Sequence, residues 1–234
     1  MSVTTEAKVE KINYISDSIR EFVLIPQKYK KFEPGQFLQL AFGIVENHQI
    51  WPDSRAFSIA SHYDKDYGKI NIVVKREKNF TTKMFKDLKE GSIATIRYPF
   101  GDFLVGEGDR PKVFIAAGTG ITPFLSYFGS ADFETFNSDI NLYYVAKDAM
   151  SLIHFDKLEH LSENHKNFHA KYYLTKETNR ENSKFNYKRI EIEDIIVDVL
   201  STDFYISGPK DFIMDLTTKL KKQGVDTVYS EEWT

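Results

Sequence analysis

The segment Val113-Phe-Ile-Ala-Ala-Gly-Thr-Gly-Ile-Thr-Pro123 decides the fold of this 234-residue chain. Its first five residues are apolar and predict a strand that is buried on both faces. The two glycines predict a tight turn, and the proline suits the first turn of a helix. Glycine lets a backbone approach a phosphate and a helix N-terminus attracts its charge, so the segment predicts a dinucleotide site, although a tight turn without a ligand would share the pattern. The candidate contacts are Gly118, Thr119, Gly120, Thr122 and Pro123.

Strands and helices alternate along the sequence from about residue 109 to the end. The expected strands are 113–117, 140–145, 168–174, 203–207 and 225–229. The expected helices begin near 123 and span 155–163, 190–200 and 210–223, and the polar stretch 176–188 is expected to be an exposed loop. This alternation predicts a parallel, doubly wound sheet in a domain of residues 109–234.

Residues 1–108 follow a different pattern, in which short apolar or alternating runs are separated by turn residues. The expected strands are 7–14, 19–25, 36–42, 55–61, 69–75 and 93–97, and one helix is expected at 82–89. Several short strands at regular spacing predict a small antiparallel β-barrel or sandwich. The sequence thus predicts two domains, an antiparallel β domain at 1–108 followed by an α/β domain at 109–234.

Composition excludes several classes of protein. The formal net charge is −3, which favours neither nucleic acid nor an anionic membrane as a partner. The sequence has no cysteine, so disulfides, Cys-ligated zinc and Cys-ligated iron–sulfur clusters are excluded, and we expect no metal site. No apolar run approaches the ~18 residues of a membrane span, and residues 1–14 lack the apolar core of a signal peptide. We therefore expect a cytoplasmic monomer.

Two constellations in the first half could hold an anion and a flat ring. Arg55-Ala56-Phe57-Ser58 offers a guanidinium for phosphate, an aromatic ring for stacking and a hydroxyl for a ring nitrogen. A half-buried edge strand with an incidental charge would look similar. The stretch 78–84 begins the predicted helix, where free N–H groups and the hydroxyls of Thr81 and Thr82 suit a pyrophosphate. Ordinary helix capping by these threonines is the alternative.

Two further constellations lie near the C-terminus. Ser207-Gly208-Pro209 follows a predicted strand and leads into a helix, as the segment at 118–123 does. Because both turns come at carboxyl ends of parallel strands, they are expected to face the same crevice. The chain ends in Ser230-Glu-Glu-Trp-Thr234, and a tryptophan so close to the end is unlike a core anchor.

Taken in this order, the motifs resemble those of the ferredoxin–NADP reductase superfamily from about residue 7 to the end. The resemblance implies an N-terminal FAD-binding antiparallel barrel and a C-terminal NAD(P)-binding domain. Arg55 would contact the FAD pyrophosphate, Phe57 would stack on the isoalloxazine, and Ser58 would bond near flavin N5. Thr81 would be the hydroxyl of a second flavin motif, which here lacks its usual glycine near Asn79. The backbone of the central strand would also contact the flavin, with Val73, Val74 and Lys75 as its candidates.

The resemblance also assigns roles in the second half. The 118–123 turn is similar to the nicotinamide-site loop of the family, and Ser207-Gly208-Pro209 is similar to its Cys-Gly-Pro turn, with a hydroxyl in place of the thiol. Glu231-x-Trp233 resembles the terminal Glu-x-aromatic motif, whose ring covers the flavin face where the nicotinamide stacks. The implied catalytic set is Ser58, Ser207, Glu231 and Trp233.

The choice between NADPH and NADH depends on one segment. Thr175-Lys176-Glu177 follows a predicted strand, and Tyr187 lies twelve residues after Thr175, a spacing similar to that of the NADP branch. Lys176 could hold a 2′-phosphate as a point charge, and Tyr187 could stack on the adenine. An exposed polar loop is the alternative. We expect NADPH, with NADH as the other possibility.

The implied activity is electron transfer between the dinucleotide and a separate one-electron carrier, through FAD. A ferredoxin, a flavodoxin or an oxygenase component could be that carrier. Two other functions stay open. An NAD(P)H-dependent flavin reductase would use flavin as a substrate. A non-catalytic flavin-binding regulatory subunit would explain the departures at Phe57, Asn79 and Ser207.

Overall fold

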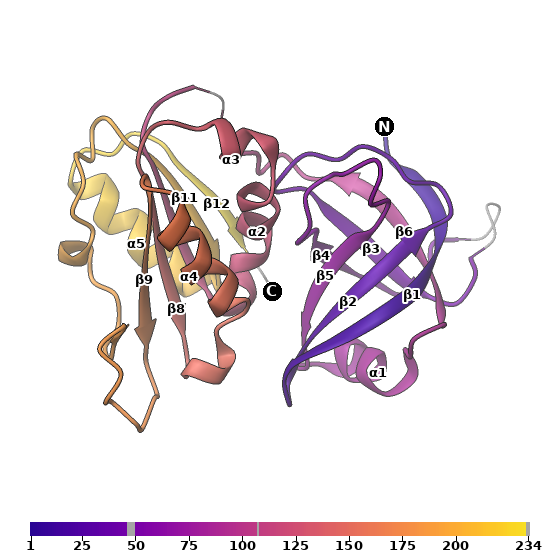
Figure 1. Cartoon of the computed structure of the whole chain (residues 1–234). Coiled ribbons are helices and arrows are strands. Elements are labelled where there is room, and N and C mark those ends of the chain that lie inside the picture. The colour runs from indigo at the N-terminus through magenta and orange to yellow at the C-terminus, as the bar shows by residue number, and fades with distance from the viewer. Residues whose placement is uncertain (46–49, 107, 233–234) are drawn as a thin grey trace. The chain divides into compact units, whose positions relative to one another are not determined.

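The computed structural model describes residues 1–45, 50–106 and 108–232 (Figure 1). Contacts between residues divide the chain into two compact units, Met1–Val105 with Thr122–Glu134 and Gly106–Ile121 with Thr135–Thr234. The grouping of residues 122–134 with the first unit is not predicted by the sequence. A domain boundary between residues 108 and 109 stays a prediction.

The first unit is built on a six-stranded sheet in which all neighbouring strands are antiparallel. The strand order is β4-β3-β6-β1-β2-β5. The edge strands β4 and β5 approach each other, because Ala60 N, just after β4, donates to Asn71 O on β5 at 2.8 Å. The sheet therefore nearly closes, which confirms the predicted antiparallel barrel. The strands are β1 Val3–Ser16, β2 Ile19–Pro26, β3 Phe37–Phe42, β4 Ser54–Ser58, β5 Ile70–Lys75 and β6 Ile93–Phe100.

Three helices accompany this sheet. They are α1 Asn79–Asp87, α2 Thr122–Phe128 and α3 Ala131–Thr135. Helix α1 begins at Asn79 rather than at Thr82, because the Thr81 hydroxyl accepts hydrogen bonds from Glu77 N and Lys78 N and so caps an earlier turn. Phe80 and Met84 turn inward from α1 and join the buried core of the barrel.

The second unit is a parallel six-stranded sheet in the order β10-β9-β8-β7-β11-β12. The order reverses between β7 and β11, which makes this pair the switch point of a doubly wound sheet. Its strands are β7 Lys112–Ala117, β8 Ile140–Ala146, β9 Phe168–Leu174, β10 Phe185–Asn186, β11 Asp203–Gly208 and β12 Val228–Glu232. Its helices are α4 Phe155–Asn164, α5 Lys210–Lys222 and the 3₁₀ turns η1 Gly118–Ile121, η2 Ala149–Ser151 and η3 Ile192–Asp194.

Helices α4 and α5 cover opposite faces of this sheet (Figure 1). Leu216 and Leu220 of α5 share a buried cluster with Ile115 of β7. On the other face, the ring of Phe155 at the start of α4 lies 4.8 Å from the ring of Tyr172 on β9. Alternate residues of a strand face opposite sides, so this arrangement confirms the predicted doubly wound fold.

Two sequence-based expectations for this unit are wrong. The expected helix at 190–200 is an irregular segment with one 3₁₀ turn, η3. It is rich in β-branched residues, and its aspartates bind nearby backbone groups: Asp194 accepts from Glu191 N and Asp198 accepts from Leu200 N. The last strand begins at Val228 rather than at 225, because Val225 N still bonds to Leu220 O in the turn that ends α5.

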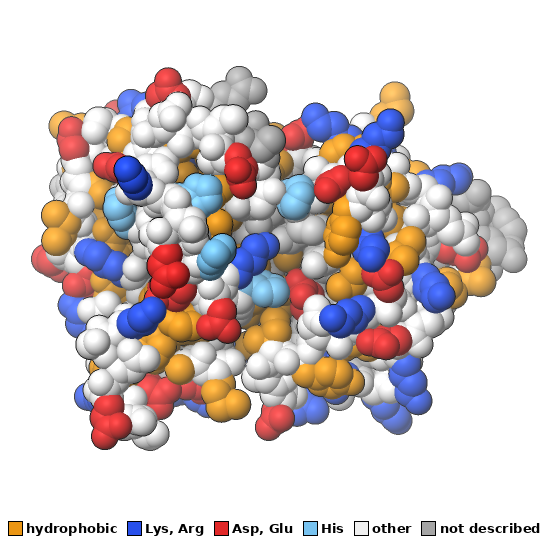
Figure 2. Space-filling model, viewed as in Figure 1, with side chains coloured by type: hydrophobic (Ala, Val, Ile, Leu, Met, Phe, Trp, Pro, Cys, Tyr) orange, Lys and Arg blue, Asp and Glu red, His pale blue; other side chains and the backbone are white. Residues whose placement is uncertain are grey.

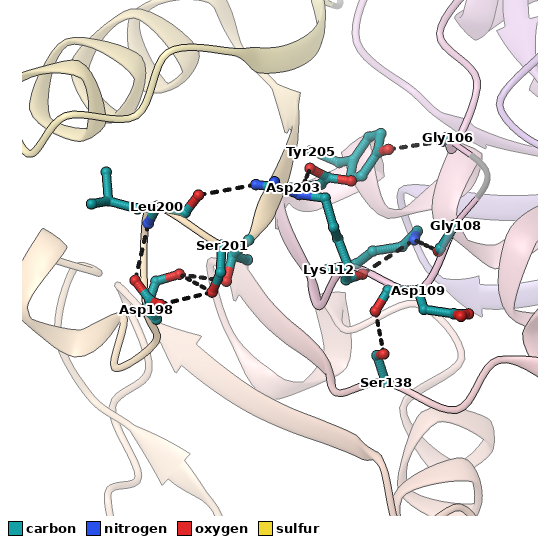
Figure 3. A network of polar contacts seen from close by, with 12 residues as sticks. Gly106, Gly108, Asp109, Lys112, Ser138, Asp198, Leu200, Ser201, Asp203 and Tyr205 are labelled. Carbon is teal, nitrogen blue, oxygen red and sulfur yellow. Dashed lines mark hydrogen bonds and ion pairs between the residues drawn. The ribbon is translucent and has the colours of Figure 1, made fainter.

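A buried lysine organises the amino edge of this sheet (Figure 3). The Lys112 ammonium is 1% exposed, donates to the carbonyls of Gly108 at 3.0 Å and Arg110 at 3.3 Å, and lies 4.1 Å from the centre of the Phe136 ring. Burial lowers its pKa. The carbonyls and the ring together compensate the charge that burial removes from water, so the segment before β7 is tied to the strand.

We expect Lys112→Met to lower the free energy of unfolding of the second unit by about 1–3 kcal/mol, because two carbonyls lose a charged donor while the side-chain volume is kept. Urea unfolding followed by circular dichroism measures the change. The exposed Lys166 gives a matched control, since Lys166→Met removes a lysine that lies in no buried network. Equal midpoints for the two variants would show that the buried contacts of Lys112 add no stability.

Candidate functional site

The first two constellations of the first unit come together in the structure. Arg55 on β4 extends over the first turn of α1, where its guanidinium carbon lies 5.6 Å from the centre of the Phe80 ring. The Arg55 side chain is 52% exposed and pairs with the exposed Asp53 at 3.6 Å. Exposed ion pairs of this kind are weak, so the guanidinium can exchange Asp53 for another anion. Arg55 thus lies beside the positive end of the α1 dipole, an arrangement that suits an anion.

The threonines of α1 contribute less than the sequence indicates. The Thr81 hydroxyl accepts from Glu77 N at 3.0 Å and from Lys78 N at 3.2 Å, and it donates to Lys78 O at 3.1 Å. It is therefore occupied by local capping. Thr82 is exposed, and its N–H already bonds to Lys78 O at 2.9 Å. The anion-binding capacity of this turn thus lies in Arg55 and the helix N-terminus.

Ser58 is the most informative residue of the first unit. It is 3% exposed, and its Oγ has no hydrogen-bond partner within the described residues. A buried polar group left without a partner costs about 1–3 kcal/mol, so such atoms are typical of sites that a ligand completes. Phe57, the preceding residue, is half-buried and lies against the core of the barrel, and Ala56 is exposed. A flavin fits this pair, because it offers both a flat ring and ring nitrogens.

The free edge of β5 supplies backbone groups. Asn71 directs its N–H and C=O away from β2, since they bond to Ser61 Oγ and Ala60 N. Backbone groups alternate in direction along a strand, so those of Val73 and Lys75 also point away from β2. Val74 faces β2 instead, where Arg20 is its register partner. The candidates for backbone contact with a flavin are therefore Val73 and Lys75.

In the second unit, the two predicted glycine turns touch each other. A Cβ atom at Gly120 would lie 2.2 Å from Ser207 O, and one at Gly208 would lie 3.0 Å from Ala117 Cβ. Only glycine permits the approach at Gly120, because the three atoms that a Cβ there would meet, Ser207 O, Ser207 C and Gly208 N, all belong to the backbone. Gly118 has a φ of 56°, which glycine adopts without strain. Both turns lie at the switch point, where open α/β sheets bind their ligands.

The strands beside the switch point align the predicted catalytic residues. Ser207 on β11 is fully buried and is the register partner of Ala116 on β7 and of Glu231 on β12. Two residues earlier, the rings of Phe114, Tyr205 and Tyr229 stack across the same three strands, with centres 5.2 and 4.9 Å apart. This stack fixes the register that sets Glu231 beside Ser207. Trp233 lies outside the described residues.

The residues predicted to bind the adenosine half of the dinucleotide, here called the adenosine end, are Thr175, Lys176 and Tyr187. Lys176 is exposed, and its backbone N–H bonds to Lys147 O at 2.8 Å. Thr175 Oγ1 donates to Ala146 O at 3.3 Å. The Tyr187 hydroxyl is bound to both backbone groups of Asn182, and within the described residues no recorded contact joins Tyr187 to Lys176.

Sequence reasoning gave no role to two residues that bond to these segments, Glu177 next to Lys176 and Tyr144 on β8. The carboxylate of Glu177 accepts from the backbone N–H groups of Ala149, Thr178 and Asn179, and these bonds lower its pKa. Tyr144 on β8 is fully buried, and its hydroxyl contacts the glycine turn itself. The available signal was the pair Tyr143-Tyr144 in a strand expected to be buried, because a buried hydroxyl requires a partner.

The described residues contain no group of three or more His, Cys, Asp or Glu side chains arranged to bind a metal ion. None of their helices combines the length and the apolar character needed to cross a bilayer.

Two family models match successive parts of the chain. The oxidoreductase FAD-binding domain matches residues 6–104, and the oxidoreductase NAD-binding domain matches residues 114–218. These matches coincide with the barrel that carries Arg55 and Ser58 and with the sheet that carries the glycine turns.

Curated relatives share the same region at modest identity. A flavohemoprotein of Halalkalibacterium halodurans is 27% identical over 230 residues, which cover 91% of this chain and 55% of that protein. The anthranilate 1,2-dioxygenase electron transfer component of Acinetobacter baylyi is 24% identical over 210 residues, 88% of this chain and 59% of that protein. The chain thus spans little more than half the length of these relatives.

Solved structures share the fold across almost the whole chain. The flavohem-like FAD/NAD binding domain of nitric oxide dioxygenase from Vibrio cholerae superposes with a TM-score of 0.86 at 20% identity, covering 98% of both chains. A ferredoxin NADP+ reductase from Neisseria gonorrhoeae with bound FAD and NADP gives 0.78 at 22% identity, covering 94% of this chain and 92% of that one.

We expect Gly120→Ala to weaken binding of a nicotinamide dinucleotide about a hundredfold while FAD stays bound, because the new Cβ must push two backbone turns apart. Isothermal titration calorimetry with NADP+ and NAD+ measures the affinity, and flavin absorbance measures FAD. In the control Gly68→Ala, the new Cβ meets nothing within 4 Å, so this change adds only the backbone strain of a φ of 63°. Undiminished dinucleotide affinity in Gly120→Ala would contradict the assignment of this turn.

Proposed function

Because the chain belongs to the ferredoxin–NADP reductase-like flavoprotein oxidoreductases, we propose that it moves electrons between NADPH and a one-electron carrier through bound FAD. The observation that carries this proposal is the succession of an FAD-binding and an NAD-binding domain in one chain. The unpartnered Ser58 hydroxyl in the first unit and the touching glycine turns in the second support the same conclusion. NADH is the alternative dinucleotide.

The first unit would hold the flavin at three places. Arg55 and the N-terminus of α1 would bind the pyrophosphate, and Phe57 would pack against the ring system. Ser58 would donate its hydroxyl to a ring nitrogen near N5, and the edge groups of Val73 and Lys75 would bond to the ring. Bound FAD would supply the conversion between two-electron and one-electron transfer.

The second unit would position the nicotinamide. The turn at 118–121 and the turn at 207–209 would line its binding surface. The two turns can approach each other closely because neither Gly120 nor Gly208 has a Cβ. Ser207 would lie near the nicotinamide C4. Glu231, its register neighbour, would hold a hydrogen bond or relay a proton at its carboxylate, and Trp233 would cover the ring face until the dinucleotide arrives.

Relatives support a haem or oxygenase partner as the carrier. Flavohemoproteins and a dioxygenase electron transfer component match this chain along most of its length, and each is nearly twice as long as the matched region. We propose that the acceptor is a one-electron redox centre of that class, with a ferredoxin or a flavodoxin as the other candidates. Reduction of cytochrome c and ferricyanide by the purified protein tests one-electron delivery.

We expect NADPH to bleach the visible flavin absorbance of the protein in an anaerobic titration, and to do so faster than NADH. Lys176→Ala should raise the KM for NADPH about fivefold or more without affecting NADH, because the 2′-phosphate loses one charge contact. Lys157→Ala removes an exposed lysine of α4 and serves as the control.

The titration also separates the alternatives. Equal bleaching by NADH would support the reductase activity but contradict the NADPH-specific roles of Lys176 and Tyr187. A yellow protein that neither dinucleotide bleaches would indicate the regulatory subunit. A colourless protein that reduces added flavin would be a flavin reductase.

We expect Ser58→Ala to retain FAD but to slow flavin reduction by NADPH about tenfold, because one hydrogen bond near N5 is lost. The unfolding temperature of the FAD-free protein should not fall, since the Ser58 hydroxyl has no partner there. The control Ser92→Ala loses the bond from Lys89 N and should show the opposite pattern, lower stability and normal reduction. Stopped-flow absorbance measures the reduction, and an unchanged rate in Ser58→Ala would refute its role.

A further inference from the structure

Tyr144 bridges two segments of the candidate dinucleotide site that are far apart in sequence. Its hydroxyl donates to Gly118 O in the glycine turn at 3.1 Å and accepts from Ile153 N, just before α4, also at 3.1 Å. The side chain is fully buried, and burial raises its pKa, so the phenol keeps its proton. Both bonding directions of the hydroxyl are therefore used at once.

The bond to Gly118 fixes the orientation of a peptide in the turn. A trans peptide is planar, so once the Gly118 carbonyl points at Tyr144, the N–H of Thr119 in the same plane points the opposite way. Gly118 has no side chain to fix its own backbone, and its positive φ is one of several that glycine adopts readily. Tyr144 thus supplies the restraint that the glycine lacks.

Tyr144 also occupies the same cross-strand row as the predicted catalytic residues. Register partners link Tyr144 to Ala116, Ala116 to Ser207, and Ser207 to Glu231. These side chains lie on one face of the sheet, one row before its carboxyl edge. The Tyr144 hydroxyl therefore contacts the glycine turn from the strand next to the one that leads into it.

The bond to Ile153 extends the bridge toward the predicted adenosine end. Ile153 closes the loop at 147–154, and this loop is bound to the segment after β9 by two hydrogen bonds. Lys176 N donates to Lys147 O at 2.8 Å, and Ala149 N donates to Glu177 Oε2 at 3.1 Å. The 147–154 loop is thus bound to Tyr144 near its end and to Lys176 and Glu177 near its start.

We infer that Tyr144 is a positioning residue for dinucleotide binding, which holds the 118–121 turn and the 147–154 loop at a fixed separation. The hydroxyl touches neither reacting atoms nor cofactor; it acts through Gly118 and Ile153. The inference rests on the proposed function, because it concerns the same dinucleotide. It adds a residue on β8 to the candidate residues that follow β7, β9 and β10 and to those on β11 and β12.

The test compares Tyr144→Phe with Tyr143→Phe in the FAD-loaded, full-length protein. Tyr143 is the adjacent buried tyrosine on the opposite face, and its hydroxyl bonds to the backbone at Ile196, away from the glycine turn. Tyr144→Phe removes a hydroxyl with two bonds to the backbone, and Tyr143→Phe removes one that bonds to the backbone at Ile196. Calorimetry with NADP+ and NAD+ gives the affinity, and amide hydrogen exchange over 147–154 gives the order of the loop. Steady-state reduction of ferricyanide separates KM from kcat.

We expect Tyr144→Phe to bind the dinucleotide about fivefold more weakly, with KM raised, kcat nearly unchanged and faster exchange over 147–154. Tyr143→Phe should lose similar thermal stability but keep wild-type affinity. Tyr144→4-aminophenylalanine keeps a donor for Gly118 O and should recover part of the affinity; it also replaces Tyr144→Phe in the comparison if that variant does not fold.

Three outcomes decide between the claims. Unchanged affinity in Tyr144→Phe, or equal losses in both phenylalanine variants, would overturn the role of Tyr144 while the proposed function stands. Failure of the wild-type protein to bind either dinucleotide would instead overturn the proposed function, and the role of Tyr144 with it. A loss confined to Tyr144→Phe, with recovery by the aniline, would support both.

Discussion

The contact between the backbones at Gly120 and Ser207 is the constraint on which the rest of the second unit depends. It brings together turns that are almost ninety residues apart, which requires β7 and β11 to be neighbours although β8, β9 and β10 come between them in sequence. That adjacency is the switch point of the sheet. The stack of Phe114, Tyr205 and Tyr229 then holds the register, so the strand ends, and the residues on them, stay level.

The two units prepare for their ligands in different ways. The barrel offers incomplete bonding: a buried hydroxyl at Ser58, outward backbone groups on β5 and a weakly paired Arg55. In the sheet, by contrast, Tyr144 and Glu177 already bind the backbone of the glycine turn and of the loop at 147–154. The first arrangement gains its missing bonds from a resident cofactor. The second is rigid before its ligand arrives, which suits a dinucleotide that must bind and leave in each cycle.

The sequence predicted those features that depend on local pattern. Apolar runs and turn residues located most of the strands, and the glycine turns could be placed at one crevice because parallel strands share an edge. The segment at 190–200 was mistaken for a helix because apolar spacing outweighed the aspartates that bind their own backbone there. The sequence left two roles open for Thr81, anion binding and helix capping, and the structure shows its hydroxyl in the capping bonds. The role of Tyr144 depends on cross-strand register, which a single sequence does not contain.

The free edge of β5 has a second consequence. A strand whose Val73 and Lys75 backbone groups point outward can pair with the edge of another chain as readily as with a ring, so a barrel newly released from synthesis is open to aggregation until flavin is bound. The residues from Lys75 to Lys78 are all charged and all exposed. They follow the apolar run of β5 directly and act as gatekeepers against such pairing. These charges therefore oppose pairing of the β5 edge with another chain.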